Sequence, residues 1–175
     1  MSGEGVPTIL VVTGSRRRLN ERDHDLVKRI VGRELDGSRG LVAVGDATGV
    51  DALVYQLARQ HPRWKPRRFE ADWRRHGSAA GPLRNEEMCV EAGRLAQALG
   101  ARVVALAFPD PESTGTWDCV RRMARRGWRP AVAGIGERDS KPENPAEFDR
   151  AEVESRGYPC SVDYEALILG ESEDG

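Results

Sequence analysis

The chain has 175 residues, 39% of them hydrophobic, and a formal net charge of −1, which is enough material to bury one sizeable core. No apolar stretch approaches the roughly 20 residues that span a bilayer, and the N-terminus shows no signal-peptide pattern, so we expect a cytoplasmic protein without a membrane partner. Three cysteines without CxxC spacing predict neither a disulfide framework nor a cysteine zinc site.

Charge is distributed unevenly along the chain. Residues 135–175 contain 12 acidic and 4 basic side chains, whereas residues 1–134 contain 16 acidic and 23 basic ones. The basic part suits an anionic ligand, although surface arginines alone would give the same count. We expect a ligand-binding domain over 1–134 and an acidic C-terminal extension over 135–175. The extension is expected to hold a short helix (146–156), a docking segment (164–169) and a disordered end.

In chain order, short apolar runs alternate with segments of helical periodicity. Runs typical of strands occupy residues 9–12, 41–44, 68–71, 103–108 and 130–133. Helical spacing of apolar residues follows over 23–35, 51–60, 81–99 and 114–126. This alternation predicts an α/β fold, a three-layer sandwich with a mainly parallel sheet of about five strands and right-handed crossovers.

Small, polar or charged residues follow each of these strands. Parallel strands of an open sheet all end at one edge, and ligands bind there, near the point where the strand order reverses. Glycine together with Ser, Thr, Asp and Arg is typical of a site for a phosphate-bearing ligand. We therefore expect the ligand at the carboxyl edge of the sheet.

The segment Thr114-Gly115-Thr116 opens a helix directly after a strand. The first turn of a helix has unpaired N–H groups and a partial positive charge, and glycine lets a phosphate approach the backbone. An ordinary threonine cap would have the same sequence.

The turn from Gly45 to Asp51 carries a second set of small and acidic residues. Gly45 and Gly49 permit a positive φ or the close approach of a ligand. Asp46 is placed to bind a ribose hydroxyl, and Asp51 is placed to cap the following helix. Plain turn and cap chemistry remains the alternative.

Two further pairs complete the candidate residues. Arg84 and Asn85 fall in the expected first turn of the third helix, where the helix dipole disfavours a cation unless it faces an anion. Asp72 and Trp73 follow the third strand. Trp73 either stacks on a nucleobase, with Asp72 on a sugar or base edge, or is a core residue.

Several other kinds of chemistry lack a sequence signal. His24, His61 and His76 share no metal-ligand spacing, and the chain contains neither a P-loop nor a GxGxxG fingerprint. We therefore expect no metal site and no cofactor.

Taken together, these segments resemble the SLOG superfamily, the Rossmann-like domains related to the Lonely Guy phosphoribohydrolases and DprA-type DNA-processing proteins. The likeness is greatest to its YspA/YpsA-related branch. The matching residues are Val12-Thr13-Gly14-Ser15-Arg16, Gly45 to Asp51, Ala71-Asp72-Trp73, Ala80 to Asn85 with Met88, and Thr116-Trp117 before Val120-Arg121. The resemblance covers residues 8–134 and implies a Rossmann-like fold with a nucleotide-derived ligand at the strand carboxyl ends.

One departure from the family pattern concerns catalysis. The phosphoribohydrolases have a Gly-Gly-x-Gly-Thr-x-x-Glu stretch whose Glu assists cleavage of the N-glycosidic bond. Aligning Gly115-Thr116 with it places Cys119 at the Glu position, and Arg84 matches the arginine of that site. A thiol stabilises developing positive charge poorly. Asp118, about 100° round the helix, is an imperfect substitute.

Three functions follow, in order of preference. The first is a sensor or sequestering protein for a nucleotide-derived small molecule, with a homo-oligomer left open. Its phosphate would be held by Gly14, Ser15, Thr114, Gly115 and Thr116 and neutralised by Arg16 and Arg84, with Gly45 and Asn85 lining the site. Asp46 and Asp72 would bind ribose, and Trp73 the base.

The second function is a nucleotide N-glycosidase that uses Arg84 with Asp118 or Asp46. The third is single-stranded DNA binding by analogy with DprA. It would use interleaved basic and aromatic residues such as those of 63–68. Because part of 63–68 belongs to an expected strand, we do not expect nucleic acid as the partner.

Overall fold

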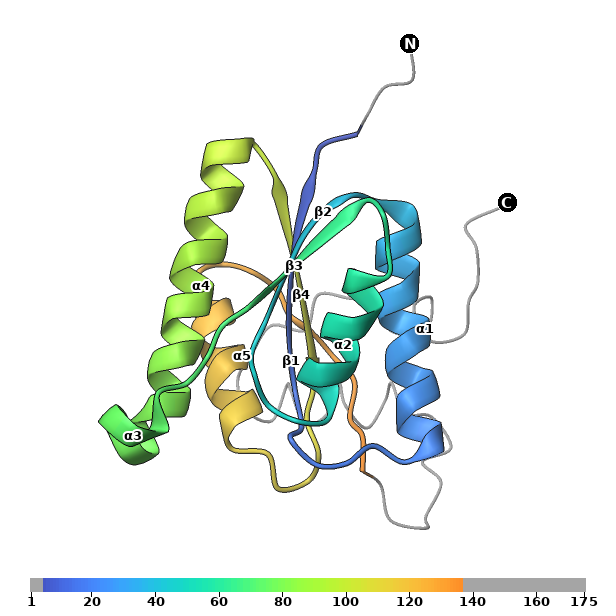
Figure 1. Cartoon of the computed structure of the whole chain (residues 1–175). Helices are drawn as coiled ribbons and strands as arrows, with labels where there is room; N and C mark the ends of the chain where they lie inside the picture. The colour runs from blue at the N-terminus through green and yellow to red at the C-terminus, as the bar shows by residue number, and fades with distance from the viewer. Residues whose placement is uncertain (1–4, 137–175) are drawn as a thin grey trace.

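The computed structural model describes residues 5–136, which form an α/β sandwich around one parallel sheet (Figure 1). The strand order is β3-β2-β1-β4-β5, and every neighbouring pair is parallel. The strands are β1 (Thr8–Gly14), β2 (Gly40–Val44), β3 (Trp64–Arg68), β4 (Arg102–Phe108) and β5 (Ala131–Val132). The expected fold class is confirmed.

Helices cover both faces of the sheet. They are α1 (Glu21–Gly37), α2 (Val50–Arg59), α3 (Trp73–His76), α4 (Ala80–Leu99) and α5 (Gly115–Arg125), and a 3₁₀ turn, Gly77–Ala79, joins α3 to α4. Figure 1 shows α1 and α2 on one side of the sheet and α4 and α5 on the other. None of these helices is long and apolar enough to cross a membrane.

The alternation of side chains along β1 explains the two cores. Leu10 and Val12 belong to a buried cluster that includes residues of α1 and α2, whereas Ile9 and Val11 belong to a second cluster with residues of α4 and α5. All four are fully buried, as expected for a central strand covered on both faces.

The position of the third strand differs from the prediction. The sequence favoured residues 68–71, but β3 spans Trp64–Arg68 and pairs with β2 alone. Because β3 lies at the edge of the sheet, its charged side chains reach solvent and Pro66 is tolerated. Trp64 is buried, and its indole N–H donates to the Leu35 carbonyl at 2.9 Å.

The start of α4 also differs. It begins at Ala80, so Arg84 and Asn85 lie in its second turn. The sequence had predicted the first turn for both residues. The unfavourable effect of the helix dipole on a cation is confined mainly to the first turn, so the dipole gives Arg84 no particular need of an anion.

The strand order reverses at β1, which pairs with β2 on one side and with β4 on the other. The chain leaves β1 toward α1 on one face and leaves β4 toward α5 on the opposite face. A crevice opens at the carboxyl ends of two strands arranged in this way. The expected linker from Gly134 onward, the helix over 146–156 and the docking segment over 164–169 fall almost wholly outside the described residues.

Candidate functional site

A pocket of about 620 Å³ lies at the carboxyl edge of the sheet, where the strand order reverses. Its wall is built from the turn after β1, the turn after β2, the first turns of α4, and the loop from β4 into α5. The described residues therefore form a pocket at the edge of the sheet where we expected the ligand.

The N-terminus of α5 forms part of this wall through Thr114, Gly115 and Thr116. Thr114 occupies the N-cap position, but its side chain makes no capping hydrogen bond. Gly115 is exposed, and apart from its chain neighbours and its own helix backbone no described atom lies within 4 Å of a Cβ placed on it. The first-turn N–H groups of this helix lack intrahelical partners and can bind an anion.

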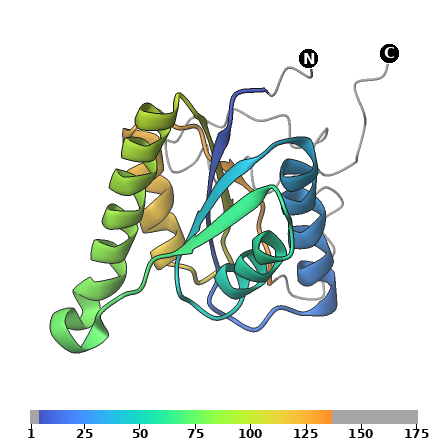
Figure 2. The same cartoon turned by 45° about the horizontal axis from the view of Figure 1, so that its top comes forward.

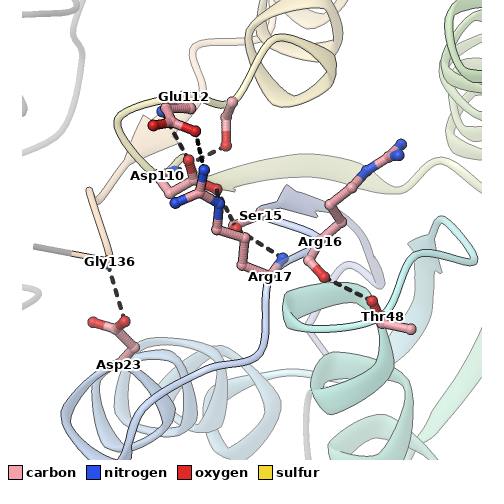
Figure 3. A network of polar contacts seen from close by, with 9 residues as sticks. Ser15, Arg16, Arg17, Asp23, Thr48, Asp110, Glu112 and Gly136 are labelled. Carbon is pink, nitrogen blue, oxygen red and sulfur yellow. Dashed lines mark hydrogen bonds and ion pairs between the residues drawn. The ribbon is translucent and has the colours of Figure 1, made fainter.

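The turn after β1 contributes differently from what the sequence suggested. Gly14 lines the pocket, and a Cβ there would lie 2.6 Å from the Val50 side chain, so glycine lets α2 approach the strand end. Ser15 is buried, and its N–H donates to the Phe108 carbonyl. Its hydroxyl donates to Asp110 (Figure 3). Ser15 thus joins the ends of β1 and β4, and neither of its donors is free for a phosphate.

Asp110 organises the loop beyond β4. Burial alone would raise the pKa of its carboxyl, but hydrogen bonds from the Ser15 hydroxyl and the Glu112 N–H hold that pKa below its usual value. Arg17 forms an ion pair with Glu112, and its Nε lies 3.9 Å from Asp110 Oδ2 (Figure 3). This part of the rim is therefore held by an internal charge network.

Arg84 and Asp46, which were expected to bind different parts of the ligand, bind each other. Arg84 Nη1 donates to Asp46 Oδ1 at 2.6 Å, and the Ala71 N–H donates to Asp46 Oδ2 at 3.1 Å. A Cβ on Gly45 would lie 2.4 Å from Arg84 Nη1, so glycine at this position makes room for the guanidinium.

Asn85 and Asp118 fasten α4 to α5 beneath the pocket. Asn85 is buried, and its Nδ2 donates to the Gly115 carbonyl at 3.2 Å and to Asp118 Oδ2 at 3.0 Å. Burial alone would raise the pKa of Asp118, but the hydrogen bond from Arg122 outweighs it and the pKa lies below its usual value. Cys119 is fully buried. The carboxylate that a glycosidase would use is thus already paired, and the thiol does not line the pocket.

Trp73 is exposed to 46% and lines both the main pocket and a neighbouring hollow of about 160 Å³. The Arg16 guanidinium carbon lies 5.5 Å from its ring centroid, within the range of a cation–π contact. Trp73 is therefore a surface residue and not a core one. Asp72 caps α3 by accepting the Arg75 N–H at 3.0 Å, and it does not line either pocket.

The structure adds pocket residues that sequence reasoning missed, among them Arg17, Asp51, Ser113 and Arg121. Arg121 follows Thr114 by seven residues, so helical periodicity could have placed both on one face. Arg16 and Arg121 line the pocket, and neither makes a salt bridge within residues 5–136. No group of three or more His, Cys, Asp or Glu residues in this part of the chain could hold a metal ion.

No model of a known protein family matches the sequence. The gene 61 protein of Mycobacterium phage D29 is 36% identical to this chain over 124 residues, which are 67% of this chain and 90% of the phage protein. The chain belongs to the family of this phage protein. Its name states no activity, so the chemistry of the family has to be inferred from the site.

Two solved structures have a fold similar to that of this chain. DprA from Streptococcus pneumoniae superposes with a TM-score of 0.57 at 14% identity, covering 97% of this chain. DprA from Helicobacter pylori superposes with a TM-score of 0.55 at 12% identity, covering 94% of this chain and 80% of its own. This chain spans only 63% of the length of the Streptococcus protein. These similarities show a shared Rossmann-like fold, whereas membership of the SLOG superfamily and of its YspA/YpsA-related branch stays a prediction.

The Helicobacter structure also corrects an expectation about partners. It is described as showing a single-stranded DNA binding mode of that DprA protein. Proteins with this fold therefore include one that binds nucleic acid. Our expectation that nucleic acid is not a partner is wrong.

Proposed function

We propose that this protein binds single-stranded DNA, with a backbone phosphate at the N-terminus of α5 and a base against Trp73. The observation that carries the proposal is the position of Trp73. It is an exposed aromatic ring, in contact with a cation, on the rim of a pocket that also contains a helix N-terminus. Proteins that bind single strands combine base-stacking aromatic rings with cationic grooves in this way.

The phosphate part of the proposal rests on the groups around the α5 N-terminus. The uncapped first turn at Thr114 and Gly115 supplies backbone donors and the positive end of the helix dipole. Arg16 and Arg121 line the same pocket without salt bridges inside the described region, so their charges are open to a phosphate. Arg84, paired with Asp46, contributes less net charge than the sequence implied.

The proposed path of the DNA strand beyond the pocket rests on α3. This helix projects beyond the carboxyl edge of the sheet (Figures 1 and 2), and all four of its residues are exposed. Arg74 and Arg75 follow Trp73 directly on the same exposed helix, and Arg16 lies over the ring. A DNA strand leaving the pocket over Trp73 would meet the positive charges of Arg74 and Arg75. The stretch 63–68 does not serve this purpose, because Trp64 is buried.

A free nucleotide is the second candidate. The pocket volume of about 620 Å³ falls within the range typical of small-ligand sites. Arg17 and Glu112 both line the pocket and pair with each other, which leaves one cation fewer for the backbone of a long DNA strand. Such a protein would be a nucleotide sensor or sequestering protein.

Binding of fluorescently labelled oligothymidylate, followed by anisotropy, tests the proposal. At physiological salt we expect a dissociation constant on the order of 1–100 µM or tighter. A duplex of equal length should bind more weakly, because its bases cannot stack on Trp73. Unlabelled nucleoside monophosphates are the competitors. Binding of monophosphates without measurable binding of oligothymidylate would replace the first candidate by the second.

A further inference from the structure

Asp51 is a buried carboxyl group in the wall of the proposed anion site. It lies in the first turn of α2, is 4% exposed, and lines the pocket with Gly14 and Ala47. Its Oδ2 accepts the Ala47 N–H at 3.2 Å. Its Oδ1 has no hydrogen-bond partner among the described residues. A buried polar atom without a partner is rare in proteins, and here it belongs to a residue that faces a pocket.

Charged groups reach Asp51 from each neighbouring element. Arg84 approaches from α4 and Arg16 from the turn after β1, whereas Asp46 in the turn after β2 repels it. On the α5 side, the neighbouring titratable group is the buried Cys119 thiol. Neither arginine makes a hydrogen bond to Asp51, because Arg84 binds Asp46 and Arg16 stacks on Trp73. Asp51 therefore lacks the direct partner that a buried carboxylate needs.

Burial dominates this balance and raises the pKa of Asp51 to about 7, despite the opposing effect of Arg84. Near neutral pH, the side chain thus exists in both the acid and the carboxylate form. A second negative charge close by favours the acid further.

We propose that Asp51 binds the phosphate as a neutral carboxyl group, taking up a proton from solvent when the anion enters the pocket. The proton resides on Oδ1, which is buried in the free protein; a rotation of the side chain brings it against a phosphate oxygen, to which it donates a hydrogen bond, while Oδ2 keeps the Ala47 N–H. No covalent bond to the ligand forms. This inference rests on the proposed function, since it requires an anion in this pocket, and it goes beyond it by coupling binding to protonation.

The coupling has a defined sign. Binding takes up protons, so affinity falls as the pH rises through the pKa of the free protein, about 7. If only the acid form binds, the dissociation constant rises about tenfold between pH 6 and pH 8. An oligothymidylate without terminal phosphates carries only diester phosphates, which do not titrate in this range, so the ligand itself does not contribute.

The experiment measures the oligothymidylate dissociation constant from pH 6 to pH 8 for two proteins, both in a His76→Gln background. His76 lies on α3 between the pocket residues Trp73 and Ser78, and the substitution removes this imidazole from the surroundings of the pocket. The reference protein should lose about tenfold in affinity. Asp51→Asn, whose amide keeps both a donor and an acceptor, should bind with an affinity that does not change from pH 6 to pH 8.

Calorimetric titration of the wild-type protein at pH 7.5, in two buffers with different ionisation enthalpies, gives the proton uptake without any substitution. We expect roughly half a proton or more per strand bound. Binding that neither depends on pH nor takes up protons overturns the role of Asp51 and leaves the proposed function intact, as does an equal pH dependence in Asp51→Asn. Absence of oligothymidylate binding at both ends of the pH range overturns the proposed function, and the role of Asp51 with it.

Discussion

Arg84 Nη1 lies 2.6 Å from Asp46 Oδ1, so a cation on α4 is neutralised by an acid in the turn after β2. Both side chains are mostly buried, at 10% and 26% exposure. The Asp46 charge therefore reduces the attraction of this part of the pocket for an anion. The two residues act on a ligand as one unit, and their substitutions should have opposite effects.

Arg84→Ala should weaken oligothymidylate binding, and Asp46→Asn should strengthen it. Arg84→Ala leaves the Asp46 carboxylate without its cation beside the proposed phosphate, which should cost on the order of 1.5–3 kcal/mol, or roughly tenfold to a hundredfold in affinity. Asp46→Asn retains an acceptor for the Ala71 N–H and removes the competing charge, which should improve affinity by roughly 1 kcal/mol.

Anisotropy titration of both variants checks this prediction, and Arg94→Ala is the matched control. Arg94 also pairs with an acid on α4, Glu91, but it does not line the pocket. If Asp46→Asn weakens binding as much as Arg84→Ala does, Asp46 contacts the ligand itself, as the sequence first suggested.

Trp73→Ala should weaken strand binding with little effect on folding. Stacking of one base on an aromatic ring contributes about 1–3 kcal/mol, and Trp73, at 46% exposure, supports little of the core. Trp73→Phe should retain part of the affinity, because phenylalanine still offers a ring face. Anisotropy gives the affinities and thermal unfolding gives the stabilities. A large loss of melting temperature in Trp73→Ala would show that the ring has a structural role.

Arg121→Gln should reduce the salt dependence of binding. Each phosphate neutralised by a cation changes the slope of log K against log salt by about 0.7 for a single strand. Removing one such cation should therefore flatten the slope by about that amount and weaken binding at low salt. Arg59→Gln is the control, since Arg59 ends α2 and does not line the pocket. Equal slopes for Arg121→Gln and wild type would show that Arg121 contacts no phosphate.

Asp51→Asn should change how stability depends on pH even without ligand. Burial raises the pKa of Asp51 from 3.8 to about 7, so between these values the folded protein holds a proton that the unfolded chain has released. Wild-type stability attributable to Asp51 is therefore lost as the pH rises from about 4 to about 7, and stays constant above. The loss is on the order of a few kcal/mol.

Thermal unfolding across this range measures the difference between Asp51→Asn and wild type. The difference should shift in favour of the variant as the pH rises, and level off near pH 7. Asp25→Asn, an exposed acid on α1, should show no such shift. A difference that is constant with pH would mean that Asp51 titrates as an ordinary surface acid.

The fold, and a pocket at the carboxyl edge of the sheet, were predictable from the sequence, because both depend on local patterns. The apolar run Ile9 to Val12 of β1 and the helical periodicity of α1, α2 and α5 are short-range signals, and parallel strands necessarily end at one edge. The segments around Gly14 and Thr114 to Thr116 lie in the pocket wall for this reason, and their contact with a ligand stays a prediction.

Only the tertiary structure decided what each polar side chain binds. Ser15 donates to Asp110, 95 residues away, and Arg84 pairs with Asp46, 38 residues away, so no local pattern records either contact. Burial is likewise a property of the whole fold: it made Trp64 a core residue, left Trp73 exposed and enclosed Asp51 beside the pocket. Hydrogen bonding and desolvation depend on neighbours in space, and the chain specifies those neighbours only once it has folded.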